Sequence, residues 1–147
     1  MGRDDVEKAE SVDPFRVSAD ETQLKNCSQT ALAHVGDAVY ELLVRTYLTL
    51  SGDRTASRLH RDKLSYVRAE AQAEIFEKIF PILTPEEQEI CRRGRNTHVR
   101  SLPKSVSPAD YHAATALETL FGWLYLTGSR ERIGKLFQFV TDTVSET

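Results

Sequence analysis

Apolar residues recur at the three- and four-residue spacing of an α-helix along most of this chain, and no segment shows sustained alternation of apolar and polar residues. This pattern predicts an all-α fold, a helical bundle around one core. The predicted helices cover residues 28–50, residues 55–80 with room for a break near Ser65, residues 84–95 or 96, residues 107–128, and a last segment from Ser129 onward.

Two of these helices have strong start signals. Thr84-Pro85-Glu86-Glu87 and Ser107-Pro108-Ala109-Asp110 each combine a capping hydroxyl, a proline at the first helical position and an acid in the first turn. These signals define where the helices begin more firmly than apolar spacing alone.

The length of 147 residues fits one domain with its own core. We expect residues 1–20 to form a flexible acidic tail and residues 21–147 to form the domain. No apolar run approaches the roughly 20 residues of a membrane helix, and residues 1–10 lack the features of a signal or transit peptide, so a cytoplasmic location is expected. Cys27 and Cys91 lack the spacing of a zinc site and are predicted to be buried or half-buried thiols.

The net charge of −3 is unevenly distributed along the chain. Residues 1–22 hold seven acids and three bases, so this segment carries −4 and the remainder carries +1. No acid occurs between Glu89 and Asp110, and a second basic group spans residues 54–68. Such basic stripes suit a polyanion, although a solvated helix face explains them equally well.

Two polar features interrupt apolar helices. Gly36-Asp37 lies inside the first predicted helix, where glycine costs about 1 kcal/mol and aspartate is a weak helix former. Glu118 lies among the apolar residues of the helix that begins at Ser107. A carboxylate beside a core needs a base, a hydrogen-bond donor or a metal ion. From spacing alone, pairing with arginine is the favoured interpretation and a metal site is the alternative.

The residues around Asp37 resemble the signature helix of the ribonuclease III family. The run Leu32-Ala33-His34-Val35-Gly36-Asp37-Ala38-Val39 is similar to the family pattern Leu-Glu-Phe-Leu-Gly-Asp-Ala-Val in its Gly-Asp-Ala-Val core and apolar flanks. The family's second motif, Asp-x-x-Glu before a small, apolar stretch, resembles residues 115–122. Glu118 is kept there, whereas Thr115 replaces the family's Asp and Ala33 replaces its earlier Glu.

These departures and the short length resemble the Mini-ribonuclease III branch, a catalytic domain without a double-stranded-RNA-binding domain. Further similar runs follow in order at residues 59–60, 66–73, 93–96 and 111–115. The resemblance covers about residues 28–132.

The resemblance implies an endonuclease that uses Mg²⁺, or Mn²⁺ in its place, to cut double-stranded RNA into products with a 5′ phosphate and a short 3′ overhang. Asp37 and Glu118 would be the catalytic and metal-binding carboxylates. Thr115 could hold a metal-bound water, and Glu41 is expected to form an ion pair rather than bind the metal. Two carboxylates are enough, because Mg²⁺ keeps several waters and is commonly held by one or two carboxylates plus phosphate.

The branch is associated with maturation of the large-subunit (23S) ribosomal RNA precursor, where a ribosomal protein could reshape the substrate. The alternative is a non-catalytic scaffold of the same fold that binds double-stranded RNA or the ribosome. Retention of both carboxylates argues against the scaffold.

Recognition of RNA is expected to depend on shape, because A-form RNA hides its base edges and displays phosphates and 2′-hydroxyls. The acid-free stretch from Ile90 to Ala109 is predicted to be a mobile arm that grips phosphates, with the basic face at residues 54–68 as the alternative path. The candidate RNA-binding residues are Arg93, Arg95, Asn96, Arg100, Lys104 and His60.

A homodimer is expected because one such domain offers only half of a valley for RNA. The predicted interface is the helix that contains Gly36, where the missing side chain would let a second chain approach closely.

Overall fold

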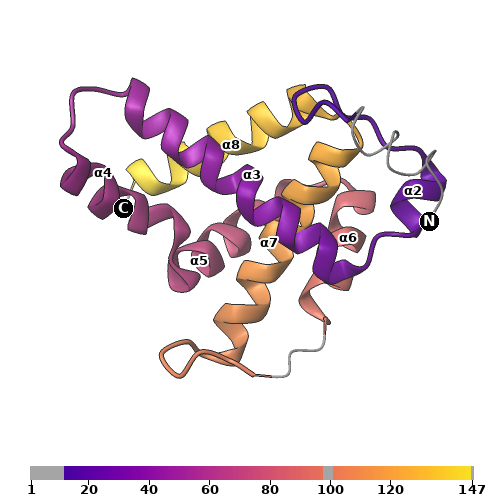
Figure 1. The fold of residues 1–147 in the computed structure, drawn as a ribbon. Helices are drawn as coiled ribbons and strands as arrows, with labels where there is room; N and C mark the ends of the chain where they lie inside the picture. Colours follow the sequence, from indigo (N-terminus) through magenta and orange to yellow (C-terminus); the bar gives the residue numbers. More distant parts are fainter. Residues whose placement is uncertain (1–11, 98–100, 147) are drawn as a thin grey trace.

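A computed structural model describes residues 12–97 and 101–146 of the protein. Within these ranges the structure contains helices and no strand, which confirms the predicted all-α fold (Figure 1). The elements are α2 (Glu21–Lys25), α3 (Gln29–Leu50), α4 (Ala56–Val67), α5 (Ala69–Ile79), the 3₁₀ turn η1 (Phe80–Ile82), α6 (Pro85–Arg95), α7 (Pro108–Leu126) and α8 (Arg130–Ser145).

The predicted helix starts are confirmed by their caps. The hydroxyls of Ser28 and Ser107 accept hydrogen bonds from the backbone three residues later, at 3.0 and 3.2 Å. Thr84 forms a reciprocal capping box with Glu87. The short helix α2 was not predicted, because five residues are too few to show a periodic pattern.

The break in the second predicted helix lies at Arg68, three residues beyond the expected position. Arg68 has an extended backbone, with φ −64° and ψ 146°, and separates α4 from α5. The Tyr40 hydroxyl donates a 2.7 Å hydrogen bond to the Tyr66 carbonyl, which a continuous helix would have used internally. The partner of that carbonyl is on α3, so the local sequence gives no sign of the exact break.

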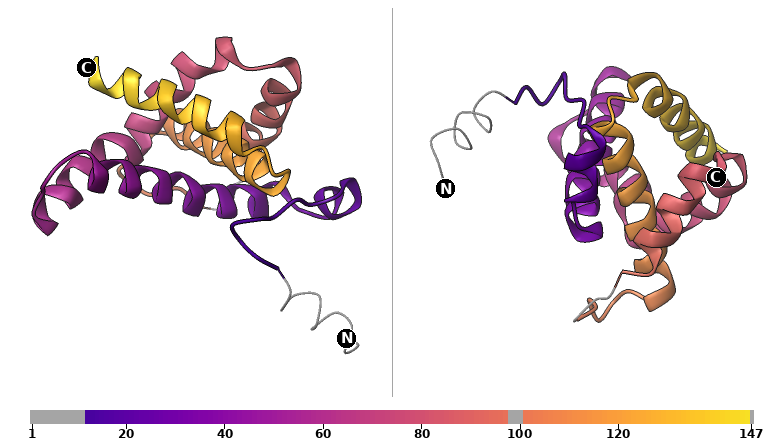
Figure 2. Two further views of the ribbon diagram at one scale, coloured as in Figure 1. Left: turned by 90° about the horizontal axis from the view of Figure 1, so that it is seen from above. Right: turned by 90° about the vertical axis from the view of Figure 1, so that its right-hand side faces the viewer.

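Helix α7 lies at the centre of the bundle and is packed against α3, α5 and α6. Seen from above, α3 and α8 lie on opposite sides of α7 (Figure 2). The core side chains with essentially no exposure include Tyr40, Val44, Leu117, Leu120, Phe121 and Val140. Cys91 belongs to this core and Cys27 is half-buried, as predicted.

Part of the segment predicted to be a flexible tail contacts the domain. The Ala19 amide donates a 2.7 Å hydrogen bond to the Leu126 carbonyl, and the Tyr125 hydroxyl donates to the Pro14 carbonyl. These contacts place residues 14–19 beside the C-terminal end of α7. Residues 1–11 lie outside the described ranges, so the flexible tail stays a prediction for them.

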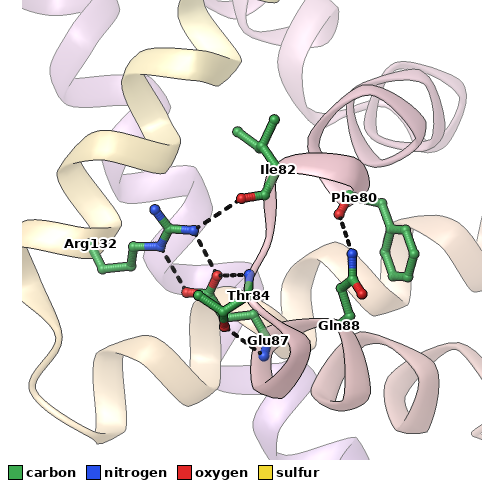
Figure 3. A network of polar contacts seen from close by, with 6 residues as sticks. All are labelled: Phe80, Ile82, Thr84, Glu87, Gln88 and Arg132. Carbon is green, nitrogen blue, oxygen red and sulfur yellow. Dashed lines mark hydrogen bonds and ion pairs between the residues drawn. The ribbon is translucent and has the colours of Figure 1, made fainter.

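A partly buried ion pair joins α6 to α8 (Figure 3). The Arg132 guanidinium donates two hydrogen bonds to the Glu87 carboxylate, at 2.8 and 2.7 Å, and the Thr84 amide donates a third at 2.9 Å. Burial works to raise the pKa of Glu87, but the hydrogen bonds from Arg132 and Thr84 outweigh it and lower the pKa. The pair therefore holds α8 against the start of α6 while both charges stay satisfied.

No helix in the described residues is both long and apolar enough to cross a membrane.

Candidate active site

Helices α3 and α7 cross with their backbones in contact. A Cβ atom added to Gly36 would lie 1.6 Å from the Glu118 carbonyl oxygen, and one added to Gly122 would lie 2.0 Å from the Leu32 carbonyl oxygen. Neither position has room for a side chain. Glycine at both positions is therefore what lets the two helices approach so closely.

The crossing of α3 and α7 contradicts the prediction that Gly36 lets a second chain approach closely. Gly36 is buried against α7 of its own chain, so it offers no close approach to a second chain. The glycine that interrupts the first helix is explained by packing within one subunit.

The same crossing brings Asp37 and Glu118 close enough to repel one another. Asp37 follows Gly36 on α3 and is exposed, while Glu118 on α7 is half-buried. Burial, and then the charge of Asp37, raise the pKa of Glu118 to about 8. The pKa of Asp37 is also raised, first by burial and then by Glu41, against a lowering effect of His34.

Other polar side chains surround these carboxylates. The Gln72 side chain of α5 is nearly buried, and as a polar neighbour it lowers the pKa of the Glu118 carboxyl against the larger effects of burial and Asp37. The Thr115 hydroxyl, one turn before Glu118, donates a 2.9 Å hydrogen bond to the Tyr111 carbonyl. Glu41, one turn after Asp37, accepts from Lys63 at 2.7 Å and from Arg45 at 3.0 Å.

The donor set fits a hard divalent cation. Burial opposes the ionisation of both carboxylates, Glu41 also opposes that of Asp37, and Asp37 opposes that of Glu118, so both would gain from a cation between them. Among the described residues there is no group of three or more His, Cys, Asp or Glu side chains that could hold a metal. A site of two carboxylates suits Mg²⁺, which completes its shell with water and phosphate oxygens.

The candidate RNA-binding residues do not form one cluster. Arg93 lies 3.5 Å from Glu89 and lines a cleft beside α2, whereas Arg95 lies over the Phe76 ring at 5.9 Å. Asn96 caps α6, and Lys104 is exposed in the segment 101–107 before α7, which projects from the bundle in Figure 1. Arg100 lies outside the described residues.

The prediction of a mobile arm from Ile90 to Ala109 is therefore partly wrong. Its first residues, up to Arg95, belong to α6, where Ile90, Cys91 and Gly94 are buried. Its bases are also not free of acids, because Glu89 lies 3.5 Å from both Arg92 and Arg93. Acids were counted only within residues 90–109, so Glu89, one turn earlier on the helix, was overlooked.

A hollow lined by basic side chains lies farther along α3 than the two carboxylates. It is formed between α3 and α4, and its charged or titratable lining residues are Arg45, His60 and Lys63. Asp37, Glu41 and Arg45 follow one another at four-residue spacing, so they share one face of α3. Among the residues that line the hollow, His60 was a candidate from the sequence and Arg45 was not, although the spacing of Arg45 from Asp37 was an available signal.

A central helix crossed by a second one, with two acidic side chains meeting at the crossing, defines an all-α domain suited to divalent-metal chemistry. Residues 30–129 match the Ribonuclease III domain family. The chain is 45% identical over 113 residues to Mini-ribonuclease 3 of Symbiobacterium thermophilum, covering 77% of this chain and 87% of that protein. It is 38% identical over 125 residues to Mini-ribonuclease 3 of Enterococcus faecalis, covering 84% and 95%.

Among solved structures, the crystal structure of protein FN1578 from Fusobacterium nucleatum superposes with a TM-score of 0.75 at 32% identity, covering 82% of this chain and 96% of that one. The chain belongs to the ribonuclease III family of endoribonucleases, in the group named Mini-ribonuclease 3.

Proposed function

We propose that this chain hydrolyses double-stranded RNA with Mg²⁺ bound by Asp37 and Glu118. The observation that carries the proposal is the crossing of α3 and α7, because it brings together the two acids that match the family's motifs. The family supports endoribonuclease activity on double-stranded RNA. The metal and the roles of the two residues are our own inference.

The roles of the chain's residues follow from their positions. Asp37 and Glu118 would hold the metal, and Thr115 lies one turn from Glu118, where it could orient a water. When bound, the ion would acidify an attacking water and offset charge on the phosphate. Glu41, held by Lys63 and Arg45, is proposed to support the site without binding the metal.

The RNA backbone is proposed to run from the carboxylates over the hollow between α3 and α4. Arg45 lies eight helical steps after Asp37, or about 12 Å along the helix axis. Arg45 and Lys63 share Glu41 and His60 is exposed beside them, so this face offers bases close to the site. Asn96, Lys104 and Arg100 are proposed as contacts at the α6–α7 connection, whereas Arg93 and Arg95 mark an alternative path over α6 that this proposal does not use.

We further propose that the active form is a homodimer and that the physiological substrate is the 23S ribosomal RNA precursor, with a ribosomal protein as a further partner. The dimer is proposed because one domain offers only half of a valley wide enough for an RNA duplex.

Mapping RNA ends in total RNA from a strain that lacks this protein tests the proposed substrate. Accumulation of uncut 23S precursor is expected, and normal 23S ends would refute it.

The test of the activity is cleavage of long double-stranded RNA in Mg²⁺, with and without chelator. Cleavage should require the metal, and Asp37→Asn or Glu118→Gln should abolish it without loss of fold or RNA binding, since each removes a ligand charge at nearly constant volume. Glu131→Gln, an exposed acid of α8, is the matched control and should cleave normally. Cleavage by either site variant at saturating Mg²⁺ would refute the assignment, and no chelator-sensitive cleavage would favour the scaffold.

A further inference from the structure

Glu41 joins two bases that belong to different helices. Its Oε1 atom accepts a 2.7 Å hydrogen bond from the Lys63 ammonium of α4 and a 3.0 Å hydrogen bond from the Arg45 guanidinium of α3. Both ion pairs therefore meet at one oxygen atom of one carboxylate. The pKa of Glu41 is lowered, chiefly by the hydrogen bond from Lys63 and against the effect of burial, so this carboxylate is charged at neutral pH.

The two bases differ in how firmly they are held. The Lys63 side chain is 16% exposed and reaches across from α4 to α3, so its position depends on the packing of both helices. The Arg45 side chain is 64% exposed and is paired with an acid one turn earlier on its own helix. Exposed pairs of this kind contribute little to stability. Arg45 can therefore leave Glu41 easily, whereas Lys63 stays in place.

A phosphate oxygen could take the place of Glu41 Oε1 between these bases. Carboxylate and phosphate oxygens both accept charge-assisted hydrogen bonds from ammonium and guanidinium groups. Arg45 and Lys63 line the hollow between α3 and α4, over which the RNA backbone is proposed to run. Glu41 therefore already binds the two bases that an RNA phosphate in the hollow would need.

Two other roles for Glu41 fit these contacts less well. Glu41 lies one turn after Asp37 and could be read as a further metal ligand, but its Oε1 atom is engaged by two cations that would compete with a metal ion. A structural link between α3 and α4 needs only Lys63. It gives no reason for Arg45 to share the same oxygen.

We propose that Glu41 is an internal counterion of the RNA-binding surface, which holds Arg45 and Lys63 in the free protein and is displaced from Arg45 by an RNA phosphate when the duplex binds. The inference rests on the proposed function, since it uses the RNA path over the hollow. Binding is weakened because an ion pair must be broken and because the charge of Glu41 repels the phosphate. The same weakening eases release of the cut RNA.

The experiment measures the affinity of Glu41→Gln for a double-stranded RNA in chelator, over a range of salt concentrations. Glutamine keeps an acceptor oxygen for Lys63 and removes the charge. Glu89→Gln is the matched control. Glu89 also lies near two bases, Arg92 and Arg93, at 3.5 Å from each, but on the face that the proposed RNA path does not use.

Glu41→Gln should bind the duplex about threefold or more tightly than wild type at low salt, as expected when one weak ion pair no longer has to be broken. The gain should shrink as salt rises, because salt screens exposed charges. Glu89→Gln should bind with nearly wild-type affinity. In an Arg45→Gln background, the gain from Glu41→Gln should be much smaller, since no arginine is left to release.

Wild-type affinity in a folded Glu41→Gln variant would overturn the inference, and Glu41→Ala decides the question if the glutamine variant does not fold. Equal gains from Glu41→Gln and Glu89→Gln, or an equal gain with and without Arg45, would reduce the effect to net charge and also overturn it. If Arg45→Gln weakens binding while Glu41→Gln matches wild type, only the counterion role fails. Cleavage by Asp37→Asn at saturating Mg²⁺, measured separately, is instead the sign that the proposed function fails.

Discussion

Glu118 is held where ionisation is unfavourable, because burial and the neighbouring Asp37 both oppose its negative charge. A folded-state pKa of about 8 means that the folded protein keeps a proton on Glu118 over a range of pH in which the unfolded chain has lost it. The metal-free protein should therefore lose stability as pH rises from about 4.5 to about 8.

We predict that Glu118→Gln removes this part of the pH dependence. Between pH 5 and pH 8 in chelator, the wild-type free energy of unfolding should fall by roughly 2 kcal/mol more than that of the variant, after allowing for partial exposure. Urea unfolding at several pH values measures the difference. Parallel pH profiles for the two proteins would contradict the prediction.

The sequence could predict Asp37 and Glu118 as candidates because each is a polar interruption of an apolar helix. It could not predict Gln72, since nothing in Ala71-Gln72-Ala73 shows whether that glutamine faces solvent or the core. Arg45 was missed for a similar reason, because its value as a site residue depends on α4 lying beside α3. Contacts between helices that are distant in sequence are what the local pattern leaves out.

At the scale of helices, Gly36 and Gly122 determine how closely α3 and α7 pack. Gly94 of α6 plays a similar part on another side of α7, where an added Cβ would lie 2.5 Å from the Thr119 hydroxyl oxygen. Two of the three helices that pack most closely against α7 therefore meet it through a glycine.

We predict that Gly36→Ala destabilises the protein by about 3 kcal/mol or more, because the new methyl group meets backbone that cannot move without separating α3 from α7. Any folded fraction should lose cleavage, since Asp37 and Glu118 would be displaced from each other. Thermal and urea unfolding measure the loss.

Gly134→Ala is the matched control for Gly36→Ala. It is also a helical glycine, on α8, but an added Cβ would meet nothing within 4 Å. Removing this glycine should stabilise the protein by up to about 1 kcal/mol. Equal effects of the two substitutions would show that helix propensity, rather than the crossing, explains Gly36.

At the scale of the whole molecule, one side of α3 remains apolar and partly uncovered. We call this the apolar face: it is a hollow whose lining includes Phe15, Val35, Ala38, Val39 and Leu42, and Phe15 and Leu42 are 75% and 55% exposed. The homodimer is proposed to form here, on the same helix that was predicted but without a role for Gly36.

We predict that Leu42→Lys converts the proposed dimer to a monomer, because a charge in the apolar face cannot be buried unpaired. Sedimentation at micromolar concentration measures the mass, and cleavage should fall with it. Leu50→Lys, an 81% exposed residue at the far end of α3, should remain dimeric. A monomeric wild type with full activity would contradict the proposal.

A second whole-molecule prediction compares two arginines of similar surroundings. Arg45 and Arg93 are 64% and 58% exposed in their side chains, and each lies near a glutamate four residues earlier. Because the proposed RNA path follows α3 and α4, Arg45→Gln should reduce the slope of log affinity against log salt by about 0.9, as expected for one lost phosphate contact. Arg93→Gln should leave the slope near wild type, and the reverse result would place the RNA over α6.

The contact of α3 with α7 also bears on how this domain can change over generations. The distance between the two acids is set by main chain against main chain, so aliphatic residues elsewhere in the core can be exchanged while that distance is kept. Neither glycine can be replaced one step at a time, because any side chain at either position separates the helices before a compensating change arises. A library built to improve this enzyme should therefore vary the core freely and hold Gly36 and Gly122 constant.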